Sequence, residues 1–123
     1  MSEYGVVIVS HVPEIAAGVA RLIKEVAADI SVTTAGGTDE GGIGTSAMKI
    51  QSAFEANAGQ ELLAFYDLGS AKMNLELAQE LTDKTVHLYD VALIEGCYTA
   101  AALLQAGTDL AAIEAQLAPL KIK

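Results

Sequence analysis

The sequence predicts an α/β fold with three layers, in which a mainly parallel sheet lies between helices on both faces. Segments that are typical of strands alternate with segments of helical periodicity, and the links between them are short. Residues 6–9 are apolar without alternation, as expected for a strand that is buried on both faces. The length of 123 residues suits one core, so we expect residues 1–123 to form a single domain.

The first half of the chain is predicted to contain two strands and two helices. Residues 5–9 form the first strand, and a helix begins near Pro13, because proline is tolerated in the first helical turn. A short second strand follows at residues 30–34. Beyond a glycine-rich loop, Thr45 or Ser46 is a suitable cap for a helix that runs to about residue 58.

The second half repeats the same alternation. Strands are predicted at residues 62–66 and 86–89, and a helix lies between them. Asp90 is the expected cap of an alanine-rich helix that continues through residue 104, and a last helix covers residues 109–117. The periodic leucines of these helices are predicted to lie in the core, namely Leu75, Leu77, Leu81, Leu103, Leu104 and Leu110.

His11 follows the first strand directly, at the carboxyl end where open α/β sheets place their chemistry. If the strand order is 2-1-3-4, the first and third strands are neighbours, and Asp67 then lies close to His11. A neutral imidazole is a nucleophile near neutral pH. We therefore interpret His11 as the carrier of a phosphoryl group. Asp67 has two possible roles at this stage, which are to orient the ring or to cap the third helix.

The glycine-rich loop at residues 35–45 also allows two interpretations. Its glycines let backbone N–H groups approach phosphoryl oxygens, and such donors stabilise phosphoryl transfer electrostatically. In the other interpretation, the glycines only permit turns. We predict that the stabilising residues at the site are Gly37, Thr38, Gly44, Thr45 and Ser70.

Several segments together carry a family resemblance. They are Ser10-His11 after the first strand, residues 35–39 and 43–49, the turn at residues 66–71, and residues 92–96. In this order and spacing they resemble the phosphotransferase subunits of phosphoenolpyruvate-dependent dihydroxyacetone kinases, which are similar to mannose-type IIA domains of the bacterial sugar phosphotransferase system. The resemblance covers most of the chain, from the first strand through the fourth helix.

The resemblance implies a phosphohistidine relay. His11 would accept a phosphoryl group from the histidine-containing phosphocarrier protein and pass it to ADP on the nucleotide-binding subunit of the kinase. The resulting ATP phosphorylates dihydroxyacetone, which links the relay to glycerol metabolism. The sequence ends at Lys123 without further domains, so we expect the donor to be a separate protein. The resemblance also implies a homodimer.

Alternative functions remain open at this stage. A IIA domain of a mannose-type sugar transporter belongs to the same class, and a nucleotide- or dinucleotide-binding module is a different one. The glycine-rich loop lacks the lysine of a nucleotide P-loop, because Ile43 follows Gly42. A response-regulator receiver domain would explain Asp67 as a phosphorylated aspartate, but this chain has Ser10-His11 after the first strand where a receiver has an acidic pair.

Composition limits the remaining classes. The formal net charge of −9 argues against a nucleic-acid partner, and no apolar run is long enough to span a membrane. We expect a cytoplasmic protein, since there is no export signal and the one cysteine, Cys97, gives no disulfide framework. No metal-ligand spacing occurs, and His87 is expected to be structural. We therefore predict no cofactor and no metal, only a covalent phosphohistidine intermediate.

Overall fold

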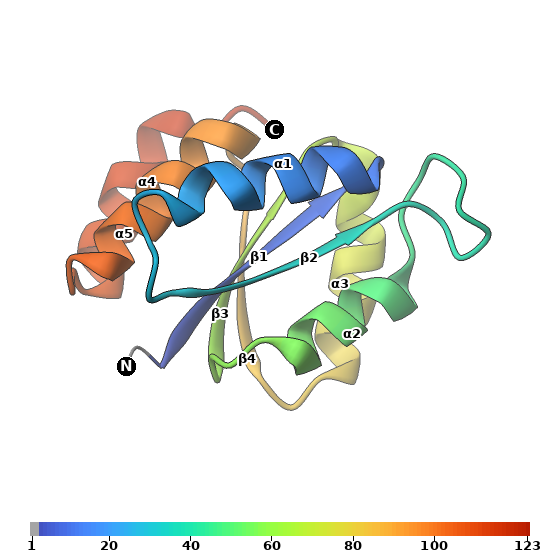
Figure 1. Ribbon diagram of the computed structural model, residues 1–123, viewed down its shortest axis with the longest axis horizontal. Helices are drawn as coiled ribbons and strands as arrows, with labels where there is room; N and C mark the ends of the chain where they lie inside the picture. Colours follow the sequence, from blue (N-terminus) through green and yellow to red (C-terminus); the bar gives the residue numbers. More distant parts are fainter. Residues whose placement is uncertain (1–2) are drawn as a thin grey trace.

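The computed structural model describes residues 3–123 and contains one parallel sheet within that range (Figure 1). Its strands are β1 (Tyr4–Ser10), β2 (Ser31–Gly36), β3 (Glu61–Tyr66) and β4 (Thr85–Tyr89). The strand order is β2-β1-β3-β4, and all of the pairings are parallel, which confirms the predicted topology. The carboxyl ends of β1 and β3 therefore lie side by side.

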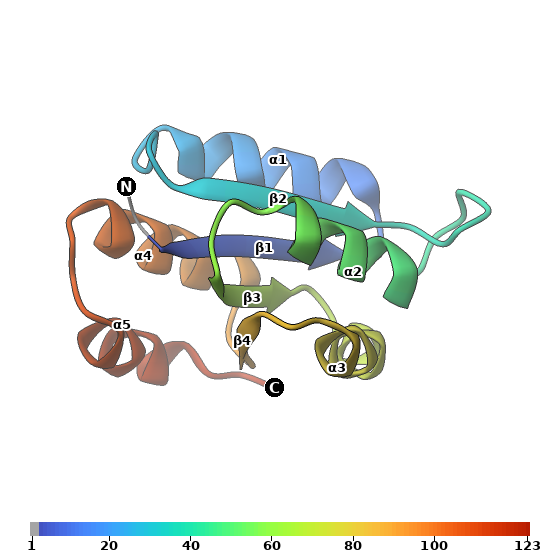
Figure 2. The ribbon, with the colours of Figure 1, turned by 90° about the horizontal axis from the view of Figure 1, so that it is seen from below.

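Helices cover both faces of the sheet (Figures 1 and 2). The helices α1 (Pro13–Lys24), α4 (Leu93–Gln105) and α5 (Leu110–Leu117) pack on one face, and α2 (Ala47–Ala56) and α3 (Lys72–Leu81) pack on the other. Successive side chains of β1 alternate between the two apolar clusters. This division explains why residues 6–9 of the central strand are all apolar, as the sequence suggested.

Three predictions about individual residues are wrong. Asp90 does not cap α4, because that helix begins at Leu93 and its cap residue, Ala92, makes no side-chain cap hydrogen bond. Leu77 and Leu81 do not lie in the core, since they are 47% and 57% exposed. The buried face of α3 is instead formed by Leu75 and Ala78, three residues apart, so the leucine pattern alone misplaced the apolar stripe.

Element boundaries differ slightly from the prediction. β2 lies one to two residues further along the chain than expected, and α2 ends at Ala56 instead of residue 58. The buried Asn57 follows α2, and its side-chain amide donates to the carbonyl of Val6 at 3.0 Å. The helix ends here because Asn57 adopts an extended backbone.

Gly36 offers a test of how closely the elements around the site are packed. A Cβ atom at Gly36 would lie 2.6 Å from the Cα atom of Pro13, and a main-chain atom cannot move away cheaply. We expect Gly36→Ala to lower the free energy of unfolding by about 1–3 kcal/mol. The control is Gly18→Ala, where the added Cβ meets nothing within 4 Å. In urea melts, the free energy of unfolding of this control should rise by about 0.5–1 kcal/mol. Equal free energies of unfolding for the two variants would contradict the packing argument.

Candidate functional site

His11 lies in the short link between β1 and α1. β1 ends at Ser10, and Val12, the cap residue of α1, has an extended backbone with φ −127° and ψ 122°. The helix begins at Pro13, which has no N–H group and therefore needs no acceptor. The imidazole is thus held at the carboxyl end of the sheet, where 17% of its side-chain surface remains exposed.

Asp67 follows β3 and faces His11, as the strand order predicted. Its Oδ1 atom lies 2.9 Å from the Nδ1 atom of His11. Its Oδ2 atom accepts hydrogen bonds from the backbone N–H of His11 at 2.9 Å and from the hydroxyl of Ser10 at 2.8 Å. The backbone N–H of Leu68 also donates to Oδ1, at 2.7 Å. Most of the hydrogen bonds to Asp67 therefore come from Ser10 and His11. Asp67 lies outside α3, because that helix begins at Lys72.

The charge of Asp67 fixes the tautomer of the ring. Burial alone raises the pKa of Asp67, but the hydrogen bonds from His11, Ser10 and Leu68 outweigh burial and hold the pKa below its ordinary value. An ionised carboxylate only accepts hydrogen bonds, so the Nδ1 atom of His11 carries the proton. In the neutral ring, the Nε2 atom then has a free lone pair.

Ser70 lies on the opposite side of the imidazole. It belongs to a 3₁₀ turn, Gly69–Ala71, that joins β3 to α3, and its Oγ atom is 2.7 Å from the Nε2 atom of His11. Since Nε2 is unprotonated when Asp67 holds Nδ1, the hydroxyl of Ser70 donates to it. Of the predicted stabilising residues, Ser70 is the one with a direct hydrogen bond to the ring.

The glycine-rich loop is tied to the site through its backbone. The N–H of Gly44 donates to the carbonyl oxygen of His11 at 2.9 Å, so this donor is already used. Thr38 accepts from the N–H of Gly42, and Thr45 accepts from the amide of Asn74. Both hydroxyl groups act as acceptors in these bonds, and each therefore keeps its own proton for another partner.

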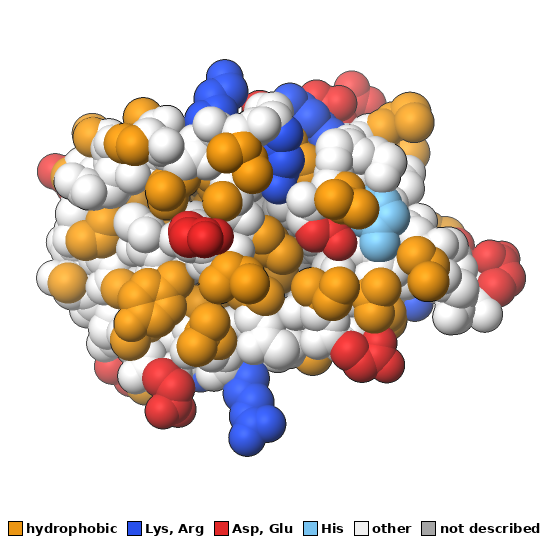
Figure 3. All heavy atoms as spheres, turned by 90° about the horizontal axis from the view of Figure 1, so that it is seen from above, with side chains coloured by type: hydrophobic (Ala, Val, Ile, Leu, Met, Phe, Trp, Pro, Cys, Tyr) orange, Lys and Arg blue, Asp and Glu red, His pale blue; other side chains and the backbone are white. Residues whose placement is uncertain are grey.

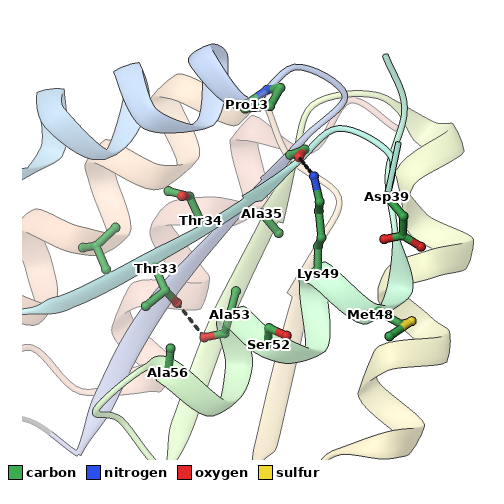
Figure 4. Close-up of a pocket in the computed structure, with 12 residues that line it drawn as sticks. Pro13, Thr33, Thr34, Ala35, Asp39, Met48, Lys49, Ser52, Ala53 and Ala56 are labelled. Atoms are coloured by element: carbon green, nitrogen blue, oxygen red, sulfur yellow. Dashed lines mark hydrogen bonds between the residues drawn. The ribbon is translucent and has the colours of Figure 1, made fainter. Parts of the chain in front are cut away.

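Gly37 and the base of the loop adopt a defined geometry. Gly37 has φ 79°, a conformation that favours glycine, so the backbone turns at this position. Next to it, the Nζ atom of Lys49 donates to the carbonyl of Gly36 at 3.2 Å (Figure 4). A groove between β2 and α2 runs past this bond, and its lining includes Pro13 and Asp39 but neither His11 nor Asp67. The site on the ring is therefore separate from this groove.

The low pKa of Asp67 leads to a prediction about stability. The ionised carboxylate stabilises the folded chain above its ordinary pKa, and this stabilisation is lost as the pH falls through the lower folded-state value. At pH 7 we expect Asp67→Asn to lower the free energy of unfolding by about 1.5–3 kcal/mol. In urea melts the difference from the parent chain should shrink below about pH 4, and a difference that is constant down to pH 2 would contradict this assignment.

Sequence reasoning missed two contributors to the site. Ser10 is fully buried, and its hydroxyl group accepts from the N–H of Val12 while it donates to Asp67. A serine at the end of an apolar strand does not by itself indicate a functional residue, although the sequence shows that Ser10 directly precedes His11. Lys123 donates to the carbonyl of Asp67 at 3.0 Å, and no local pattern in the sequence indicates this contact.

Other predicted features have simple structural surroundings. His87 lies on β4, and its Nε2 atom is 2.6 Å from the Oε2 atom of Glu61. Cys97 is fully buried in the apolar cluster under α4, and burial raises the pKa of its thiol.

Within residues 3–123, no three His, Cys, Asp or Glu side chains gather closely enough to hold a metal ion. No helix in that range is long and apolar enough to cross a membrane.

Comparison with known proteins agrees with this geometry. The family model of the PTS system fructose IIA component (EIIA-man) matches residues 5–114. The chain is 53% identical over 120 residues to the PTS-dependent dihydroxyacetone kinase phosphotransferase subunit DhaM of Lactococcus lactis subsp. lactis, and the match covers 98% of both chains. It is 45% identical to the phosphoryl donor subunit DhaM of dihydroxyacetone kinase 1 from Listeria innocua, with 98% of this chain and 97% of that protein covered.

Solved structures share the fold. The crystal structure of the unknown-function protein EF1359 is 30% identical, with a TM-score of 0.85 over 100% of this chain and 98% of that one. A sigma-54 interaction domain protein from Enterococcus faecalis is 13% identical, with a TM-score of 0.67 over 93% of this chain and 87% of that one. The second likeness concerns the fold alone.

Proposed function

Because the chain belongs to the family of PTS system fructose IIA components, we propose that it is the phosphoryl donor subunit of a phosphoenolpyruvate-dependent dihydroxyacetone kinase. In this proposal His11 accepts the phosphoryl group from the histidine-containing phosphocarrier protein. It then donates the group to ADP on the nucleotide-binding subunit of the kinase. The subunit is a carrier in the cytoplasm, and its intermediate is a covalent phosphohistidine that needs no further cofactor.

One observation supports this proposal more than any other. The two nitrogens of the His11 ring have different partners, since Nδ1 faces the carboxylate of Asp67 and Nε2 faces the hydroxyl of Ser70. A ring held in this way presents one lone pair in a fixed direction, which is the requirement for a nucleophile. We therefore assign Nε2 as the atom that is phosphorylated.

The first transfer exchanges one P–N bond for another. The lone pair of Nε2 attacks the phosphorus of the donor's phosphohistidine, and the electron pair of the broken P–N bond returns to the donor ring. The His11 ring gains positive charge during this step. Asp67 stabilises that charge through the Nδ1–H bond, and Ser70 turns its O–H from Nε2 towards a phosphoryl oxygen.

The second transfer releases the group. A β-phosphate oxygen of ADP attacks the phosphorus, the P–Nε2 bond breaks, and its electron pair returns to the His11 ring. ATP forms on the partner subunit, and His11 is again neutral with its proton on Nδ1. The carrier itself requires no nucleotide site for this step, because the partner holds ADP.

Exposed apolar side chains near His11 suit a protein donor and a protein acceptor. Ile43, in the loop that is bonded to His11, is 82% exposed, and Leu68, next to Asp67, is 59% exposed. Ile15 on α1 and Ile94 on α4 are also exposed, and the face of the molecule that these helices cover carries many hydrophobic side chains (Figure 3). Exposed apolar surface of this kind marks sites of protein interaction.

Reconstitution tests the proposed function directly. The chain is incubated with labelled phosphoenolpyruvate, the first enzyme of the phosphotransferase system and its phosphocarrier protein. We expect uptake of phosphate that survives alkali and is lost in acid, followed by ATP formation once the nucleotide-binding subunit and ADP are added. If the phosphate passes only to a IIB sugar-transport domain, the chain is a component of a sugar transporter. If the chain takes up no phosphate, the proposed relay is wrong.

Ser70 allows a smaller test of the transfer step. We expect Ser70→Ala to slow uptake of phosphate about fivefold, since one hydrogen bond to the reacting group is lost. The measurement is the initial rate with saturating phosphocarrier protein. Ser52→Ala, on the exposed side of α2, is the control and should leave the rate unchanged. Equal rates for the two variants would remove Ser70 from the mechanism.

A further inference from the structure

The last residues of the chain pair with the segment that follows β4. Val91 and Lys121 form an antiparallel bridge, the N–H of Ala92 donates to the carbonyl of Leu120 at 3.0 Å, and the N–H of Ile122 donates to the carbonyl of Asp90 at 3.2 Å. Figure 2 shows the end of the chain beside β4. These bonds carry the chain to the carboxyl edge of the sheet, where His11 and Asp67 lie.

The side chain of Lys123 turns from this segment towards the end of β3. Its Nζ atom donates to the carbonyl of Tyr66 at 2.7 Å and to the carbonyl of Asp67 at 3.0 Å. The same ammonium group lies 4.5 Å from the centre of the Tyr66 ring, within range of a cation–π contact. Burial lowers the pKa of Lys123, which fits an ammonium that is partly withdrawn from water.

Tyr66 is fixed from its other end as well. Burial raises the pKa of its hydroxyl group, which therefore keeps its proton and donates to the Oδ1 atom of Asp90 at 2.6 Å. The ammonium of Lys72 holds the other oxygen of Asp90 at 3.0 Å. With this ring in place, Lys123 binds two consecutive carbonyls of a strand end that has little freedom to move.

These two carbonyls bracket the Cα atom of Asp67. Their orientation sets the direction in which the side chain of Asp67 leaves the backbone, and that side chain receives the Nδ1–H of His11. We propose that Lys123 is a positioning residue of the relay, which holds the β3 turn so that Asp67 keeps the proton of His11 on Nδ1. The inference rests on the proposed function, and Lys123 itself touches neither the ring nor the phosphoryl group.

The substitution Lys123→Met removes the ammonium group and keeps the length of the side chain. Lys121→Met is the matched control, since Lys121 lies on the same segment, loses the same charge and keeps its backbone bridge. Lys123→Arg tests rescue, because a guanidinium also donates to carbonyl oxygens. Thermal melts of all the variants establish that each is folded under the conditions of the assay.

We expect Lys123→Met to lower kcat for phosphate uptake about tenfold while KM for the phosphocarrier protein stays within about twofold. In ¹⁵N spectra of the ring, the His11 signals should move from those of an Nδ1–H tautomer towards a mixture. Lys121→Met should match the parent chain in both measurements, and Lys123→Arg should recover most of the rate.

Two outcomes separate this inference from the proposed function. If Lys123→Met matches Lys121→Met in rate and in tautomer, Lys123 only tethers the end of the chain and the inference is wrong. If the parent chain takes up no phosphate, the relay fails, and the ring spectra still decide whether Lys123 controls the tautomer of His11.

Discussion

The His11→Ala variant is expected to take up no phosphate from phosphoenolpyruvate and the general phosphotransferase proteins. His11 supplies the lone pair that forms the new P–N bond. Within residues 3–123 its ring hydrogen-bonds to Asp67 and Ser70, and neither of these side chains is a nitrogen nucleophile. The second histidine, His87, lies on β4 and faces Glu61. The loss should therefore be complete within detection, with the same thermal unfolding midpoint to within a few degrees.

Labelled phosphoenolpyruvate measures this loss, with the bound phosphate assayed for stability in alkali and release in acid. His87→Asn is the matched control and should be labelled like the parent chain. Tandem mass spectrometry of the parent chain under alkaline conditions should find the phosphate on His11. Persistent labelling of the His11→Ala variant would end the proposal of a His11 relay.

Asp67→Asn is expected to slow phosphate uptake by about 10²–10⁴, up to the loss of about 10⁴ that follows when the carboxylate of a Ser-His-Asp triad becomes an amide. The amide of asparagine donates to the Nδ1 atom of His11 as readily as it accepts from it. When it donates, the ring proton moves to Nε2 and the nucleophilic lone pair is lost. The ring also loses the negative charge that stabilises its phosphorylated, cationic form.

The measurement is the rate of uptake under single-turnover conditions, together with ¹⁵N spectra that report the tautomer of His11. Asp109→Asn is the control, because Asp109 caps α5 through the N–H of Ala112, and asparagine is as good a cap. This control should keep the rate of the parent chain. A rate within threefold of the parent for Asp67→Asn would leave Asp67 with a structural role only.

Much of the site followed from one assumption about strand order. The uninterrupted apolar run of β1 predicted a central strand, and the order 2-1-3-4 then made β3 its neighbour, so His11 and Asp67 had to meet. Ser70 was predicted from the family resemblance of residues 66–71, and the structure places its hydroxyl group beside the ring. His11 and Asp67 were predictable as neighbours because the carboxyl ends of parallel strands share one edge of the sheet.

The residues that escaped prediction depend on contacts without a local pattern. Asp90 has the right type and place for a helix cap, but Tyr66 and Lys72 bind its carboxylate. Leu77 and Leu81 fit a helical stripe, but the small Ala78 marks the face that meets the sheet. Lys123 reaches Asp67 from 56 residues away, through a terminal segment too short to show any periodicity.

The pairing of β1 with β3 also has a consequence for biosynthesis. His11 and Asp67 are separated by 56 residues, and the bond between them exists only after these two parallel strands have paired across two intervening helices and one strand. Such non-local pairing is slow to form compared with local helical contacts. A nascent chain on the ribosome therefore exposes its histidine long before the ring is oriented, and we expect competence to receive phosphate to appear only once β3 has emerged and docked.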